Sequence, residues 1–188
     1  MRVYEYKDYD DYVQAQTETN KAKVDWVYVV RRIIKRICEY KTMPGFIICH
    51  GTRSGAEQAY FKEIYEHAYV IGTEISETAV GIKDTVHHDF TIPKKEWIGK
   101  ADIVYSNSFD HTIDPVKTMA TWKDQLNPNG RLFIEYAESQ SRGHYEDPLE
   151  ATNREINDLI KSSGMIVEDI WYNSLKHGGI MFVARLAK

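Results

Sequence analysis

The chain has 188 residues, 43% of them hydrophobic, and a formal net charge of -4 at pH 7. That length suffices for one domain with a sizeable core and is too short for two ordinary domains. The negative charge offers no broad positive field to a phosphate backbone, so we expect no general nucleic-acid binder. Two cysteines, no secretory leader and no apolar run of roughly 18 residues predict a cytoplasmic protein without a disulfide framework or a membrane span.

Residues 1–44 are predicted to form an N-terminal helical or lid segment outside the core. Its first part is polar and rich in tyrosine. From Trp26 to Ile37, apolar residues recur every three or four positions, which predicts one face of a helix. That helix should end before Pro44 and Gly45, which break helices. Its basic residues are most simply a solvated face.

Residues 45–188 are predicted to form a Rossmann-like α/β core. Short runs rich in β-branched residues alternate with helical patterns, and these runs are FIIC, YVIGTE, DTVHHD, ADIVYSN and RLFIEY. Such alternation indicates βαβ units and a mostly parallel sheet. The runs GMIVEDIWYN and GGIMFVARL are joined by a turn too short for a helix, so they should pair as an antiparallel hairpin. We therefore expect a single domain with seven strands and helices on both faces of the sheet.

A glycine turn follows the first predicted strand and opens a helix, in FIICHGTRSGAEQAYF. Gly51 and Gly55 keep the outer positions of a G-x-G-x-G pattern, with Arg53 in the middle. Backbone N–H groups and the helix dipole favour an anionic or polar group at such a junction, although any fold of this class needs a similar turn. Glu74 ends the second strand, where it could accept hydrogen bonds from ribose hydroxyls or be merely solvated. Asp89 ends the third strand, where it could accept from an adenine amino group or cap the next turn.

The chain resembles a class I S-adenosylmethionine-dependent methyltransferase of the small methyltransferase-domain type. The resemblance covers roughly residues 45–188 and is strongest in ADIVYSNSFDHTIDPVKTMATWKDQLNPNGRLFIEY. It implies S-adenosyl-L-methionine as the cofactor. The residues that it implies at the cofactor, from the methionine portion through the ribose and the adenine to the neighbourhood of the sulfonium, are Gly51, Gly55, Glu74, Asp89, Phe90, Ser106 and Asn107.

Two positions depart from the family pattern. Cys49 stands where the family has an acid two residues before the first glycine, and Arg53 replaces the middle glycine. The family's anchor for the amino group of the cofactor is therefore in question. Because this cofactor has no pyrophosphate, a side chain at position 53 need not collide with it. We expect Arg53 to offer its planar donors to the methionine carboxylate, or else to be a surface arginine or one bound to a neighbouring acid.

The acceptor is expected to be a small molecule or sugar that is methylated on oxygen. The fourth predicted strand ends in SNSFDH, which lacks the Asn/Asp-Pro-Pro-aromatic signature of the family's amino-methylating members. The candidate bases are His111, in the loop after that strand, and His144, in the predicted lid over 137–151. His87 and His88 are neighbours on a strand and point to opposite faces, so no metal centre is expected. An inactive partner subunit, a domain that binds another nucleotide such as NAD, and a homo-oligomer stay open as alternatives.

Overall fold

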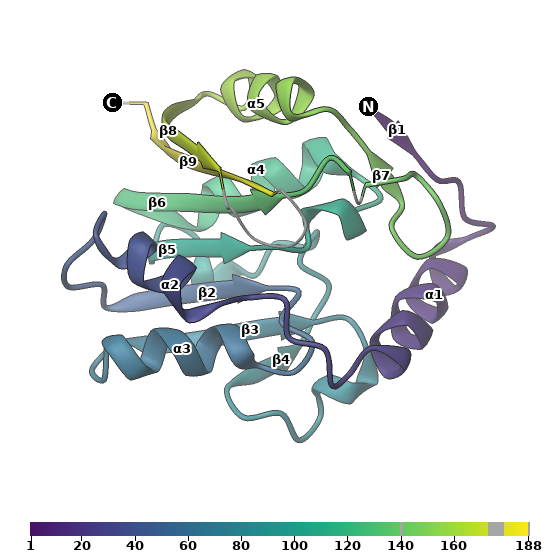
Figure 1. Cartoon of the computed structure of the whole chain (residues 1–188), viewed down its shortest axis with the longest axis horizontal. Coiled ribbons are helices and arrows are strands. Elements are labelled where there is room, and N and C mark those ends of the chain that lie inside the picture. The colour runs from purple at the N-terminus through teal and green to yellow at the C-terminus, as the bar shows by residue number, and fades with distance from the viewer. Residues whose placement is uncertain (140, 173–178, 188) are drawn as a thin grey trace.

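A seven-stranded sheet forms the centre of the molecule (Figure 1). The computed structural model describes residues 1–139, 141–172 and 179–187. The strands of the central sheet are β2 Phe46–His50, β3 Tyr69–Glu74, β4 Thr85–His87, β5 Ala101–Ser106, β6 Leu126–Tyr136, β8 Met165–Tyr172 and β9 Ile180–Leu186. They lie in the order β4-β3-β2-β5-β6-β9-β8.

The pairing of these strands confirms the predicted mostly parallel sheet with a terminal hairpin. The five strands from β4 to β6 are parallel, and β9 is antiparallel to both β6 and β8. The predicted turn between β8 and β9 falls largely on residues 173–178, outside the described residues. Because the neighbouring strands are parallel, the carboxyl ends of β2, β3 and β5 meet at one edge of the sheet.

Helices cover both faces of the sheet and create two apolar cores. The first core lies between the sheet and α2 (Arg31–Cys38) and α3 (Ala56–Ile64), and includes Ile34 and Phe61. The second core lies under α4 (Pro115–Gln125) and α5 (Asn153–Ser162), and includes Trp122. This two-sided burial explains why the strand sequences are nearly continuous hydrophobic runs.

The helix predicted from Trp26 begins only at Arg31, so its first turn was predicted wrongly. Trp26 and Val27 are 58% and 50% exposed and lie in the loop before α2, whereas Ile33, Ile34 and Ile37 are buried. Val30 is the N-cap and has an extended backbone. The apolar spacing therefore begins before the helix does, and Trp26 and Val27 are exposed side chains of the preceding loop.

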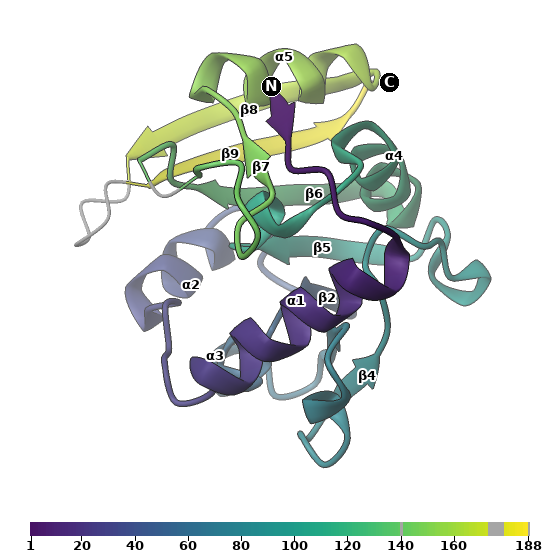
Figure 2. The ribbon, with the colours of Figure 1, turned by 90° about the vertical axis from the view of Figure 1, so that its right-hand side faces the viewer.

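Helix α1 (Tyr9–Ala22) packs across the carboxyl ends of the parallel strands, so the N-terminal segment is part of the packed molecule (Figure 2). Its buried residues include Tyr12, Gln16 and Asn20. A short pair of strands, β1 (Arg2–Val3) and β7 (Leu149–Glu150), joins the N-terminus to the segment after β6. Among the described helices, none combines the length and apolar character needed to cross a membrane.

Candidate functional site

The glycine turn between β2 and α3 brings the backbone close to the end of β5. Gly51 has a φ of 71° and its N–H donates to the Thr73 carbonyl at 2.9 Å. A Cβ on Gly51 would lie 2.5 Å from the Cβ of Ser108, so only glycine fits there. Gly55 has a φ of 79° and is the N-cap of α3. The backbone of the turn therefore accounts for glycine at both positions.

Arg53 adopts a left-handed backbone conformation that glycine would normally occupy, with a φ of 41°. This conformation directs its N–H to Oε2 of Glu74 at 3.1 Å. The guanidinium lies toward the loop before α2, with Nη1 3.5 Å from the Trp26 carbonyl oxygen and Cζ 5.2 Å from the centre of the Tyr28 ring. Among the described residues, only one of the five guanidinium N–H donors makes a hydrogen bond, so the other four are available to a carboxylate.

The two acids predicted for the ribose and adenine are buried and already bonded within the protein. Glu74 accepts from the backbone N–H groups of Arg53 and of Ser76, the latter at 2.9 Å. Asp89 accepts from the Thr91 N–H and from the Tyr9 hydroxyl, each at 2.8 Å. The turn-capping alternative for Asp89 is therefore present in the structure. Each carboxylate oxygen can accept a further bond, so neither acid is excluded as a ligand.

Two adjoining cavities lie above the strand ends. The larger has a volume of about 190 Å³ and is lined by residues that include Gly51, Arg53 and Asn107. The smaller has a volume of about 40 Å³ and lies between α1 and the end of β3, where Glu74 and Phe90 line it. Gly51, Arg53, Ser108 and His111 line both cavities. The predicted residues Gly55, Asp89, Ser106 and His144 are absent from the linings of both.

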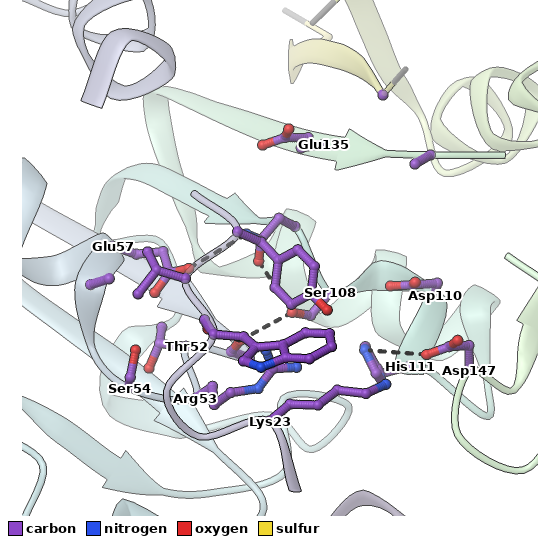
Figure 3. Close-up of a pocket in the computed structure, with 18 residues that line it drawn as sticks. Lys23, Thr52, Arg53, Ser54, Glu57, Ser108, Asp110, His111, Glu135 and Asp147 are labelled. Atoms are coloured by element: carbon purple, nitrogen blue, oxygen red, sulfur yellow. Dashed lines mark hydrogen bonds and ion pairs between the residues drawn. The ribbon is translucent and has the colours of Figure 1, made fainter. Parts of the chain in front are cut away.

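Charged side chains of both signs face the larger cavity (Figure 3). Its acids are Glu57, Asp110, Glu135 and Asp147, and its cations are Lys23 and Arg53. Lys23 pairs with Glu146 at 2.9 Å, outside the lining. Glu135 accepts from the Tyr105 hydroxyl at 3.0 Å. Such a cavity suits a ligand that carries both an ammonium and a carboxylate group.

His111 and two acids form a cluster on one side of this cavity (Figure 3). Candidate ligand atoms of Asp110, His111 and Asp147 all lie within 4.8 Å of one another. Nδ1 of His111 is 2.8 Å from Oε1 of Gln16 on α1, and Nε2 is 3.8 Å from Oδ1 of Asp147. Burial raises the pKa of Asp110. The cluster can act as an oriented base, and its three atoms could also bind a divalent cation.

His144 has a different environment. Its Nδ1 accepts from the backbone N–H groups of Glu146 and Asp147 at 3.2 and 3.3 Å, and its Nε2 is 3.6 Å from Oδ2 of Asp147. This ring therefore organises the loop that carries Asp147. Between the two predicted bases, the geometry favours His111.

Ser106 is also occupied within the protein, since its hydroxyl donates to the His50 carbonyl and accepts from the Ser108 N–H, each at 3.0 Å. Sequence reasoning missed several lining residues: Trp26, Tyr28, Glu57, Ser108, Asp110, Glu135 and Asp147. Trp26, Tyr28 and Asp147 had a usable signal, because they lie in the two segments predicted to be lids.

No family model and no curated protein matches the sequence. Solved structures do match. The 1,6-didemethyltoxoflavin-N1-methyltransferase of Burkholderia thailandensis, with bound S-adenosylhomocysteine, is 18% identical with a TM-score of 0.72, covering 95% of this chain and 87% of its own. A TehB-like S-adenosylmethionine-dependent methyltransferase of Corynebacterium glutamicum is 13% identical with a TM-score of 0.68, covering 95% and 98%. The cyclase SpnF is 11% identical with a TM-score of 0.70, covering 83% and 80%. The chain therefore has the fold of class I S-adenosylmethionine-dependent methyltransferases, a fold that also carries other chemistry.

Proposed function

We propose that this protein is an S-adenosylmethionine-dependent methyltransferase that methylates an oxygen of a small molecule or sugar. The observation that carries the proposal is the pair of adjoining cavities above the ends of β2, β3 and β5. One end offers Glu74 and Phe90 to a nucleoside, and the other offers Arg53 and Glu57 to a zwitterion. Ligands of this fold class bind where parallel strands end, which is the same edge of the sheet.

The residues present fit this cofactor if α1 moves. Glu74 would hold the ribose, Phe90 would pack on the adenine, and Arg53 would bind the carboxylate of the methionine portion. When bound, the cofactor supplies an electrophilic methyl group. The smaller cavity holds only about 40 Å³, which is room for a few water molecules at most. A nucleoside therefore requires α1 to shift away from Glu74 and Phe90 and then close again.

The acceptor would enter past the exposed loop before α2. Trp26 and Tyr28 are among the residues that line the larger cavity, and they are 58% and 43% exposed. Exposed aromatic side chains beside a polar cavity are typical of sites for small ligands. His111 lies on the cavity wall and provides a base for a hydroxyl group, in keeping with an oxygen acceptor.

A thermal unfolding experiment tests the cofactor assignment. S-Adenosylhomocysteine at a hundredfold excess over its dissociation constant should stabilise the protein by about 2.7 kcal/mol, whereas NAD should not. Stabilisation by NAD alone would overturn the proposal. The acceptor can then be found by mass spectrometry of cell extract incubated with the protein and a methyl-deuterated cofactor. Cofactor binding without any labelled product would favour a non-catalytic partner subunit.

Replacing Arg53 by alanine should weaken binding of S-adenosylhomocysteine about tenfold or more, because a charged hydrogen bond contributes roughly 1.5 to 3 kcal/mol. Calorimetric titration measures this effect. Arg53→Gly is the matched variant, since it removes the same donors but suits the left-handed backbone at φ 41°. Arg53→Gly should lose as much affinity while gaining about 1 kcal/mol of stability. Unchanged affinity in both variants would remove Arg53 from the site.

Binding of S-adenosylhomocysteine should slow hydrogen exchange in α1 (Tyr9–Ala22) relative to α5 (Asn153–Ser162). The reason is that α1 must open to admit the nucleoside, and a bound ligand holds it closed. Mass spectrometry of exchanged peptides gives the comparison. Protection confined to the glycine turn, with α1 unaffected, would show that α1 does not act as a lid.

A further inference from the structure

Glu57 is an acid of the larger cavity, and no described residue pairs with its charge. It lies in the first turn of α3 and is 7% exposed. One oxygen, Oε1, accepts a long hydrogen bond of 3.4 Å from Nδ2 of Asn107. The other, Oε2, is buried and has no hydrogen-bond partner among the described residues. Figure 3 places Glu57 on the side of the cavity away from His111 and Asp147.

A buried carboxylate with an unbonded oxygen is costly to ionise. Burial raises the pKa of Glu57 to about 7, although the Asn107 bond and the nearby Arg53 charge act in the opposite direction. Glu74, by comparison, accepts two backbone N–H bonds, and Glu135 accepts from Tyr105. Glu57 is thus prepared for a cation that none of the described residues provides as a bonded partner.

Position 49 explains why such an acid is needed. Cys49 is fully buried in the core on the α2–α3 face of the sheet, and burial raises its thiol pKa well above the usual range. A neutral buried thiol cannot balance an ammonium group. The Glu57 carboxylate lies close enough to Cys49 to contribute to that pKa shift. A carboxylate is nevertheless present nearby, on the first turn of the next helix.

We propose that Glu57 binds the α-ammonium group of the cofactor's methionine portion, in place of an acid at position 49. This inference rests on the proposed function, and it assigns the opposite ends of the zwitterion to two residues of the same loop and helix. Arg53 takes the carboxylate and Glu57 takes the ammonium group.

The test is a calorimetric titration of the full chain at pH 8 with three probes. They are S-adenosylhomocysteine, its analogue with hydrogen in place of the α-ammonium group, and methylthioadenosine, which lacks the whole amino-acid portion. The proteins are the wild type, Glu57→Gln, and Glu66→Gln as a matched control that removes an exposed charge just after α3. Glutamine keeps the size of the buried side chain, and a thermal melt checks that each variant is folded.

The wild type and Glu66→Gln should bind S-adenosylhomocysteine at least tenfold more tightly than the deaminated analogue, whereas Glu57→Gln should bind the two equally. The inference is overturned if Glu57→Gln keeps the wild-type preference, or if the wild type has none. It is also overturned if Glu57→Gln weakens methylthioadenosine as much as S-adenosylhomocysteine, because the carboxylate would then act on the nucleoside and not on the ammonium group. If methylthioadenosine and S-adenosylhomocysteine both fail to bind the wild type, the proposed function fails instead.

Discussion

Acidification from pH 6.5 to pH 3 is expected to remove about 5 kcal/mol of folding stability through His50 alone. This histidine ends β2 and is buried against α4, with its ring stacked on Trp122 at a centroid distance of 4.9 Å. Its Nδ1 is 2.9 Å from the Thr73 hydroxyl and its Nε2 is 2.8 Å from Oε1 of Gln125. Burial lowers its pKa from 6.5 to about 3, against the opposing effect of the Gln125 bond.

Acidification lowers the stability because the unfolded chain binds a proton on His50 more readily than the folded chain does. Above pH 6.5 the imidazole is neutral in the folded and the unfolded chain, so it contributes no pH dependence. Between pH 6.5 and pH 3 the unfolded chain takes up a proton that the folded chain refuses. Stability therefore falls by about 1.4 kcal/mol for each pH unit in that window.

Glu57 has the opposite effect on the pH dependence of folding stability. Its pKa is raised by burial from 4.5 to about 7, so the folded chain binds a proton more readily than the unfolded chain does. Stability due to this group therefore rises as the pH falls from 7 to 4.5, by about 1.4 kcal/mol per unit. The two effects nearly cancel between pH 6.5 and 4.5, and the loss due to His50 should emerge in the wild type only below that range.

Urea unfolding of the wild type and Glu57→Gln from pH 8 to pH 4.5 separates the two groups. At pH 8 Glu57→Gln should be more stable than the wild type by about 3 kcal/mol, and this gain should vanish by pH 4.5. Adding His50→Phe keeps an aromatic ring beside Trp122 and removes the titration. The double variant should have a lower stability at pH 8 and a flatter profile. An unchanged slope in the double variant would show that His50 is not the acid-sensitive group.

The sheet could be predicted from the sequence because its strands are buried on both faces. YVIGTE matches β3 (Tyr69–Glu74) in full. A short apolar run that is rich in β-branched residues and bounded by polar residues is typical of a strand buried on both faces. The glycine turn could be predicted for a different reason. Gly51 and Gly55 have positive φ angles, which glycine adopts more readily than other residues, so the turn leaves a signal in the sequence.

The rest of the site depends on contacts between distant segments, which local patterns do not record. Glu57 looks like any acid in a first helical turn, and only the burial of α3 against β2 and β5 makes it unusual. Helix α1 has a polar sequence because it covers a polar site: its buried residues include Gln16 and Asn20, which bond to His111 and Thr78. A hydrophobic pattern therefore could not reveal that α1 packs on the molecule.

His111 is expected to be the general base of the proposed methyl transfer. It follows β5 in the short helix η3 (Phe109–His111) and lines both cavities. In the tautomer in which Nδ1–H donates to the side-chain amide oxygen of Gln16, 2.8 Å away, Nε2 is free to accept a proton. Asp147, 3.8 Å from Nε2, can stabilise the imidazolium that forms when the acceptor hydroxyl loses its proton.

His111→Asn should lower turnover roughly 100-fold and leave the affinity for S-adenosylhomocysteine unchanged, because positioning of the cofactor does not need the base. The deficit should shrink as the pH rises, since more of the acceptor hydroxyl then ionises unaided. His144→Asn is the comparison, as its ring only holds the loop at Glu146 and Asp147. Turnover that survives in His111→Asn and collapses in His144→Asn would move the base to that loop. If both variants keep full turnover, the enzyme works by alignment alone. If a chelator reduces wild-type turnover as much as His111→Asn does, then Asp110, His111 and Asp147 bind a cation, and the role of His111 is that of a ligand.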